Sequence, residues 1–175
     1  MLSAKPLRNA EIERERAMQE HILNLLSENA RISFEEIALR LNCSVEEVAA
    51  TVADLEKKNV ICGYTAILND SASTKVNALI EVKITPQRDG GFDTVAKRIA
   101  KFDEVKELYL VSGAYDLLLE VEGESLQQVA MFVSGKLSTI EGVLSCTTGF
   151  QLKKYKQSGR LIESEESYER LKVCP

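Results

Sequence analysis

The chain has 175 residues, of which 45% are hydrophobic and 28% are charged, and its formal net charge is −5. This length holds one domain or two small domains with their own hydrophobic cores. No apolar run approaches the roughly 18 residues that a membrane-spanning helix needs, and the first residues lack the apolar core of a signal peptide. We therefore expect a soluble, cytoplasmic protein with no membrane partner.

The cysteine and histidine content argues against several kinds of site. The four cysteines are scattered and form no C-x-x-C pair, which favours reduced packing residues over a disulfide framework or a zinc site. His21 is the only histidine, so a histidine-based catalytic triad or a multi-histidine metal site is excluded within one chain. Because no paired carboxylates and no phosphate-binding glycine motif occur either, we expect neither an enzyme nor a cofactor or metal.

Three helices are predicted in the N-terminal part of the chain. Residues 1–17 form an N-terminal extension, and the apolar residues of 18–27 cluster on one side of a first helix. Two S-x-x-E motifs, which begin at Ser33 and Ser44, predict the starts of two further helices. In such a motif the serine accepts from a free backbone N–H and the glutamate reaches back to the serine. Apolar residues follow each motif at helical spacing.

The connection between the second and third helices is short enough to be a tight turn. Asn42 tolerates the left-handed conformation that such a turn needs, Ala38 lets the two helices cross closely, and Val48 closes the wedge between them. This pattern is typical of a helix-turn-helix, which places its second helix in the DNA major groove. Residues 60–67 then read as short extended structure, the wing of a winged helix.

The second half of the chain changes its hydrophobic period. The winged helix-turn-helix domain covers residues 18–68, and the polar, turn-rich residues 69–75 form a linker. Residues 76–154 then show alternating apolar and polar positions, broken by helical patterns. The predicted elements are strands at 78–84, 105–111, 117–121 and 143–152 and helices at 92–102 and 125–137. The order β-α-β-β-α-β predicts a ferredoxin-like domain with an antiparallel sheet, so the fold class is α+β.

The last residues and the charge distribution complete the description. Residues 155–175 form a polar C-terminal tail, in which Ile162, Tyr168 and Leu171 could make one docking turn of helix.

Residues 18–63 carry four basic and eight acidic residues, so the predicted helix-turn-helix domain is itself acidic. An acidic domain lacks the main electrostatic attraction to phosphate, which makes the few cations in it important.

A winged helix-turn-helix, a short linker and a β-α-β-β-α-β domain, in this order and at this length, resemble the Lrp/AsnC (leucine-responsive, or feast/famine) family of bacterial and archaeal transcriptional regulators. The resemblance covers roughly residues 18–154 and rests on residues 30–33, 55–66 and 111–116. It implies a transcriptional regulator that forms a homodimer or a higher homo-oligomer through the sheet domain. It also implies a small-molecule effector, an amino acid or a related compound, bound between subunits.

The resemblance implies double-stranded DNA as a partner of the helix-turn-helix. The candidate DNA-binding residues are Arg31, Ser33, Arg40, Ser44, Val45, Glu46, Ala49, Ala50, Lys57 and Lys58. The family's recognition helix usually carries arginines at positions that are Thr51 and Asp54 here. Phosphate contacts would therefore rest on the few cations of the domain, on Arg14 and other arginines of the extension, and on the avidity of an oligomer.

The resemblance places an effector site at a loop before the third predicted strand. The candidate effector-binding residues are Ser112, Gly113, Ala114, Tyr115 and Asp116, joined by Thr147 and Thr148 from a neighbouring subunit. Glycine lets the backbone approach a ligand, Asp116 can take an ammonium group, and Tyr115 offers a wall with a polar tip. The alternative is an ordinary hairpin turn, in which Gly and Asp are common, and two ordinary strand residues.

Three functional interpretations follow from these patterns. The first is a DNA-binding regulator that responds to an amino acid or a related metabolite. The second is a small-molecule-binding oligomer whose acidic helix-turn-helix serves protein interaction in place of DNA binding. The third is an enzyme on the same scaffold, as in the haem-pathway decarboxylases that resemble this family, against which the position of His21 in the first helix counts.

Overall fold

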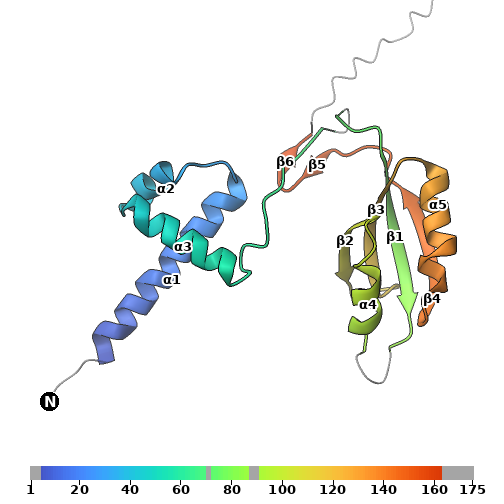
Figure 1. The fold of residues 1–175 in the computed structure, drawn as a ribbon, viewed down its shortest axis with the longest axis horizontal. Helices are drawn as coiled ribbons and strands as arrows, with labels where there is room; N and C mark the ends of the chain where they lie inside the picture. Colours follow the sequence, from blue (N-terminus) through green and yellow to red (C-terminus); the bar gives the residue numbers. More distant parts are fainter. Residues whose placement is uncertain (1–4, 70–71, 87–90, 163–175) are drawn as a thin grey trace, which may run out of the picture. The chain divides into compact units, whose positions relative to one another are not determined.

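The computed structural model describes residues 5–69, 72–86 and 91–162 of the chain, and the side chains from residue 12 onward. The chain divides into two compact units, Met1–Ala66 and Ile67–Pro175, which we describe separately (Figure 1). None of the described helices is long and apolar enough to cross a membrane.

The first unit contains three helices: α1 (Lys5–Glu28), α2 (Phe34–Leu41) and α3 (Val45–Lys57). The predicted helix at 18–27 is therefore only the second half of α1, which has 24 residues. Residues 5–17 are rich in strong helix formers but carry no apolar stripe, so hydrophobic periodicity does not reveal them. Pro6 lies in the first turn, where its missing N–H removes no helical hydrogen bond.

The two predicted capping motifs differ in the structure. At α3 the capping box is complete: the hydroxyl of Ser44 accepts from the N–H of Glu47 at 3.1 Å, and the carboxylate of Glu47 accepts from the N–H of Ser44 at 2.9 Å. At α2 the hydroxyl of Ser33 accepts from the N–H of Glu36 at 3.2 Å, but the Glu36 carboxylate accepts from Arg40. The start of α3 is thus more firmly fixed than the start of α2.

The turn between α2 and α3 has the predicted conformation. Asn42 is left-handed with φ 53°, and its N–H donates to the carbonyl of Ala38. Ala38 is only 5% exposed, which agrees with a close crossing of the helices. The helix-turn-helix core also contains residues of α1 and of the segment before α2; its fully or nearly buried members are Ile22, Leu26, Ile32, Ile37, Ala38, Val48 and Val52.

The predicted wing is wrong as a β element. Among the described residues after α3, none between 58 and 69 forms a strand. The N–H groups of Val60 and Ile61 both donate to the carbonyl of Leu55, at 2.9 and 3.2 Å, so the chain turns back onto the end of α3. A wing is a hairpin and needs a second arm, and residues 60–67 supply only one β-prone segment.

The second unit has the predicted β-α-β-β-α-β order. Its elements are β1 (Val76–Ile84), α4 (Asp93–Ile99), β2 (Val105–Leu110), β3 (Leu117–Gly123), α5 (Leu126–Gly135), the short 3₁₀ helix η2 (Leu137–Thr139) and β4 (Val143–Phe150). The four strands form one sheet in the order β2-β3-β1-β4, and each neighbouring pair is antiparallel. The predicted α+β fold and antiparallel sheet are therefore confirmed.

Helices α4 and α5 cover one face of this sheet (Figure 1). On β1 the buried positions alternate with exposed ones, as Ile80 and Val82 do with Leu79 and Glu81. The buried face packs against both helices, where the rings of Phe102 and Phe132 meet edge to face at 5.5 Å. We call the opposite face, which carries Leu79 and Glu81, the open face of the sheet.

A small hairpin follows the sheet, where the sequence predicts a polar tail. Strands β5 (Lys156–Gln157) and β6 (Arg160–Leu161) pair antiparallel. Ser158 and Gly159 connect them with φ 46° and 80°, the two positive angles of a type I′ hairpin turn. The Ser-Gly pair is a recognised turn signal.

The predicted docking turn of helix is wrong at its described residue. Ile162 follows β6, and its N–H donates to the carbonyl of Tyr155 at 2.9 Å, which extends the hairpin. Tyr168 and Leu171 lie outside the described residues.

Candidate nucleic-acid interface and ligand site

Helix α3 has one face in the core and one in solvent. Val48, Val52 and Leu55 are buried and fix the orientation of the helix. The opposite face is exposed along the whole helix. At spacings of four, three and four residues it carries Glu46, Ala50, Ala53 and Lys57. We call these four residues the outward stripe of α3; it is the part of the unit that can enter a groove of DNA.

The other predicted DNA-binding positions on α3 have different surroundings. Val45 packs against the core of the first unit, and Ala49 is half-buried beside it, so both are less able to reach a partner than the outward stripe. Ser33 and Ser44 are the N-caps of α2 and α3. Free N–H groups at a helix start suit phosphate oxygens, so these two positions fit backbone contacts better than base contacts.

Two of the four predicted cations are already paired with carboxylates. Arg40 donates to Glu36 and Lys58 contacts Asp54, each at 2.6 Å and across one helical turn. The hydrogen bond from Lys58 to Asp54 raises the pKa of the lysine. Both pairs are solvent-exposed and therefore weak, so a phosphate can compete for either cation.

Arg31 and Lys57 are more available for a phosphate contact than Arg40 and Lys58 are. Both are exposed, and neither takes part in an ion pair within the part of the chain that the structure describes. Arg31 precedes the cap of α2, and Lys57 ends the outward stripe of α3. These two cations can meet DNA without first giving up an internal partner.

The extension adds a cation next to the acidic start of α3. Hydrogen bonds from Ser44 hold the pKa of Glu47 below its usual value, and the charge of Arg14 on α1 lowers it further. Arg14 is exposed. It therefore stays a candidate for phosphate contact, as the scarcity of cations in the helix-turn-helix domain predicts for the arginines of the extension.

The loop of residues 112–116 joins β2 to β3, and Asp116 fastens it to the sheet. The Asp116 carboxylate accepts from the N–H of Ile84 at 2.8 Å, and the Asp116 N–H donates to the carbonyl of Val82 at 3.0 Å. The carbonyl of Asp116 accepts from Val111 at 2.9 Å. Asp116 thus holds the end of β1, and one carboxylate oxygen is already engaged before any ammonium group arrives.

Neither the backbone conformation of Gly113 nor the space around it requires a glycine among the described residues. Its φ is not positive, and a Cβ built on it would meet nothing within 4 Å. Ser112 and Ala114 are exposed on either side of it, whereas Tyr115 is half-buried. Among the described residues nothing approaches this backbone closely, so it is open to a ligand or a partner.

Tyr115 borders a hollow on the open face of the sheet. The hollow has a volume of about 380 Å³ and is lined by Leu79, Glu81, Tyr115, Leu118, Thr147, Thr148, Gly149 and Phe150. Thr147 pairs with Glu81 and so lies on the open face, whereas Thr148 pairs with Ile80 on the helix-covered side. Within one chain the structure brings Tyr115 and Thr147 to the same hollow.

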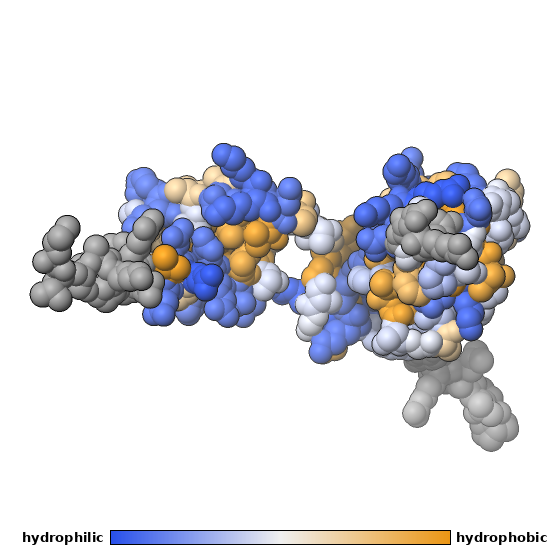
Figure 2. Space-filling view, turned by 90° about the horizontal axis from the view of Figure 1, so that it is seen from below, coloured by the Kyte–Doolittle hydropathy of each residue, from blue (hydrophilic) through white to orange (hydrophobic). Residues whose placement is uncertain are grey.

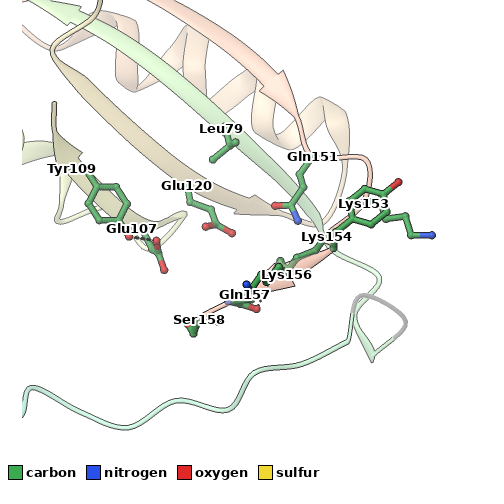
Figure 3. Close-up of a pocket in the computed structure, with 11 residues that line it drawn as sticks. Leu79, Glu107, Tyr109, Glu120, Gln151, Lys153, Lys154, Lys156, Gln157 and Ser158 are labelled. Atoms are coloured by element: carbon green, nitrogen blue, oxygen red, sulfur yellow. Dashed lines mark hydrogen bonds between the residues drawn. The ribbon is translucent and has the colours of Figure 1, made fainter. Parts of the chain in front are cut away.

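A second hollow of about 560 Å³ lies between the open face and the hairpin of β5 and β6 (Figure 3). Leu79, Glu107, Tyr109 and Glu120 project into it from β1, β2 and β3, and Gln151 and residues 153–158 line it from the other side. The Tyr109 hydroxyl donates to the Glu107 carboxylate, which raises the pKa of Tyr109. Because Leu79 lines both hollows, they are parts of one continuous face, the one on which the sequence predicts Leu79, Tyr109 and Leu118.

Both units match known domain families. Residues 19–56 match the AsnC-type helix-turn-helix domain, and residues 77–161 match the Lrp/AsnC ligand binding domain. The second match extends through β6, so it includes the hairpin as well as the sheet.

Relatives with names and solved structures agree with these matches. The HTH-type transcriptional regulator YugG of Bacillus subtilis (strain 168) is 45% identical over 157 residues, which cover 88% of this chain and 95% of the relative. The leucine-responsive regulatory protein of Escherichia coli (strain K12) is 31% identical over 144 residues, 81% of this chain and 87% of that protein. A transcriptional regulator of Neisseria meningitidis, solved in complex with L-Met, is 26% identical with a TM-score of 0.63, covering 80% of this chain and 91% of that one.

Proposed function

This chain belongs to the Lrp/AsnC family of transcriptional regulators, and we propose that it binds double-stranded DNA as a homodimer or a larger homo-oligomer and responds to an amino acid or a related metabolite. The observation that carries the proposal is the helix-turn-helix itself. Its second helix is fixed by a complete capping box and leaves its outward stripe free. We also propose the cytoplasm as its location, where such a regulator would meet DNA.

Some residues would contact the DNA phosphates and position the protein, and others would contact the bases and recognise the sequence. We assign phosphate contacts to Arg31, Lys57 and the helix starts at Ser33 and Ser44, with Arg40 and Lys58 joining once their carboxylate partners are displaced. The outward stripe of α3 would face the bases. Phosphate contacts fix the register of a protein on the duplex, whereas contacts in the groove carry sequence information.

The open face of the sheet supports assembly from several copies. Leu79 is 45% exposed and Tyr109 is 50% exposed on it, and Leu118, which pairs with Glu81 and Tyr109, lies on the same face. Apolar patches reach the surface of both units (Figure 2). A sheet covered by helices on only one side gains stability when its other side is covered as well, and a second copy of the chain presents the same apolar surface in a two-fold arrangement.

The effector site would lie at the hollow that Tyr115 and Thr147 border. Gly113 leaves backbone accessible beside it, and a second copy seated on the open face would enclose it. The L-Met complex of the Neisseria regulator supports an amino acid as the ligand class. Binding of the ligand would favour one arrangement of the subunits and so change the spacing of the paired α3 helices.

One observation favours a second function, a protein-interaction module. The helix-turn-helix domain carries four basic and eight acidic residues between 18 and 63, which is unusual for a surface that meets phosphate. A basic protein partner would be attracted to this charge. Because the second function predicts no DNA affinity, one experiment separates the two.

The test is a selection of genomic DNA fragments by the full-length protein at low salt, with and without pooled amino acids. The expected result is a small set of enriched fragments whose enrichment changes when amino acids are added. The double variant Arg31→Ala/Lys57→Ala is the matched control, and it should lose enrichment of all fragments together. If the wild-type chain enriches no fragment at about 50 mM salt, where phosphate attraction is strong, the DNA-binding proposal is wrong.

A further inference from the structure

The polar side chains in the first half of α3 are committed to the helix, with one exception. The carboxylate of Glu47 is held by the N–H of Ser44 at 2.9 Å. The hydroxyl of Thr51 donates to the carbonyl of Glu47 at 2.8 Å. Neither group can turn toward a partner without breaking the hydrogen bond that it already makes.

The two carboxylates in the second half of α3 are engaged in the same way. Asp54 is paired with Lys58 at 2.6 Å, and Glu56 accepts from the hydroxyl of Tyr64 at 2.9 Å. Tyr64 belongs to the segment that follows α3. Burial, and to a smaller extent this hydrogen bond, raises the pKa of its hydroxyl. Both carboxylates therefore serve the end of the helix.

Glu46 is the exception. It is exposed and has no hydrogen-bond or ion-pair partner among the residues that the structure describes. It is the second residue of α3, and the N-terminal residues of a recognition helix are those that approach base edges. It also begins the outward stripe, which continues with the methyl groups of Ala50 and Ala53 and ends at Lys57.

We propose that Glu46 reads a cytosine in the major groove and that Ala50 and Ala53 contact the methyl groups of neighbouring thymines. A carboxylate only accepts hydrogen bonds. In the major groove guanine offers two acceptors, thymine offers one acceptor and a methyl group, and adenine offers its donor next to an acceptor. Cytosine offers the N4 amino donor without an adjacent acceptor of its own, and it is therefore the base that suits Glu46. The inference rests on the proposed DNA binding.

A carboxylate at position 46 would improve discrimination between DNA sequences but weaken the affinity for DNA in general. The Glu46 carboxylate repels the phosphates on both sides of the groove, although the positive end of the α3 dipole partly offsets its charge. Without a cytosine in reach, the carboxylate would be left without a donor. A site lacking the cytosine should therefore bind more weakly to the wild-type chain than to a chain without the carboxylate.

The experiment is an in vitro selection from random-sequence DNA with the full-length wild-type chain and with Glu46→Gln. The wild-type chain should select a cytosine at one position of each half-site, followed by thymines. Glutamine pairs with the N6 and N7 atoms of adenine, so Glu46→Gln should replace the cytosine by adenine, with a change of about tenfold in the relative affinity of the two sites.

Two controls make the result specific. Glu20→Gln removes the same charge from an exposed position of α1, and it should keep the selected cytosine. Glu46→Ala should lose the preference and bind sites without cytosine more tightly than the wild-type chain does. Thermal melting of all variants checks that they are folded.

Selected sites without a preferred cytosine, or an unchanged preference in Glu46→Gln, would overturn this inference and leave the proposed function intact. A wild-type chain that enriches no DNA at all would overturn both. The swap from cytosine to adenine distinguishes base reading from a structural role of Glu46, because a structural role would change the affinity for all sequences equally.

Discussion

Asp116 shows how a residue can look like a ligand contact and yet hold the fold. Its carboxylate accepts from the N–H of Ile84, which lies 32 residues earlier in the chain and just beyond the last pairing of β1 with β3. No local pattern reveals a hydrogen bond over such a separation. The sequence predicts the loop of residues 112–116 as a ligand site, and this stays a prediction; it could not show that the Asp116 carboxylate is already bound to the end of β1.

We expect Asp116→Ala to lower the free energy of unfolding by about 1–3 kcal/mol, because it leaves a half-buried N–H of Ile84 without its acceptor. Urea denaturation of the full-length chain measures this change. Asp116→Asn, which keeps an acceptor oxygen, should retain more of the stability, and Ser112→Ala in the same loop should behave like the wild type. Equal stability of Asp116→Ala and wild type would show that the hydrogen bond contributes nothing.

At the scale of single elements, the sequence predicts best where the signal is local or where one face is buried. The capping box at Ser44 joins residues three apart, and the alternation on β1 follows directly from one covered face. The start of α1, the absent wing and the hairpin after β4 escape prediction for different reasons. A polar helix shows no hydrophobic periodicity, and a wing needs a partner strand. Strands of two residues, as in β5 and β6, are too short to show an alternation.

The caps of α2 and α3 should differ in their effect on stability. Ser44→Ala removes the serine half of a complete capping box, so it should lower the free energy of unfolding by about 1 kcal/mol. Ser33→Ala should have a smaller effect, because the Glu36 carboxylate is bound to Arg40 and does not complete that cap. Thermal melting of the two variants in parallel measures the difference, and a larger loss for Ser33→Ala would contradict this account of the caps.

At the scale of the whole molecule, the two units carry complementary tasks. The first unit offers the outward stripe of α3, and the second offers an open sheet face with a hollow beside the loop of residues 112–116. The family resemblance predicts candidate residues for both units, and these stay predictions. The structure is needed to show which of these side chains hold a helix together and which are free to meet a partner. Glu47 caps α3 through the N–H of Ser44, whereas its neighbour Glu46 is exposed without such a bond.

We expect the full-length chain to sediment as a dimer or a larger assembly at micromolar concentration, and Leu79→Glu to shift it toward the monomer. The reason is that Leu79 lies in the middle of the open face, where a carboxylate would stand opposite Glu120 on the neighbouring strand and would lose its water when two copies meet. Met131→Glu places the same group on α5, on the other side of the sheet, and should leave the assembly intact. A wild-type monomer at these concentrations would refute assembly through the open face.

Whether the protein regulates genes by binding DNA is decided by the salt dependence of its DNA affinity, measured by fluorescence anisotropy. The wild-type chain should bind the enriched fragments, and Arg31→Ala and Lys57→Ala should each lower the slope of log affinity against log salt by about 0.9. Asp54→Arg, which replaces an acidic group on α3 by a basic one, should strengthen binding to all sequences. If neither the wild-type chain nor Asp54→Arg binds DNA at about 50 mM salt, conditions that favour phosphate contacts, the regulator described here does not act by touching DNA.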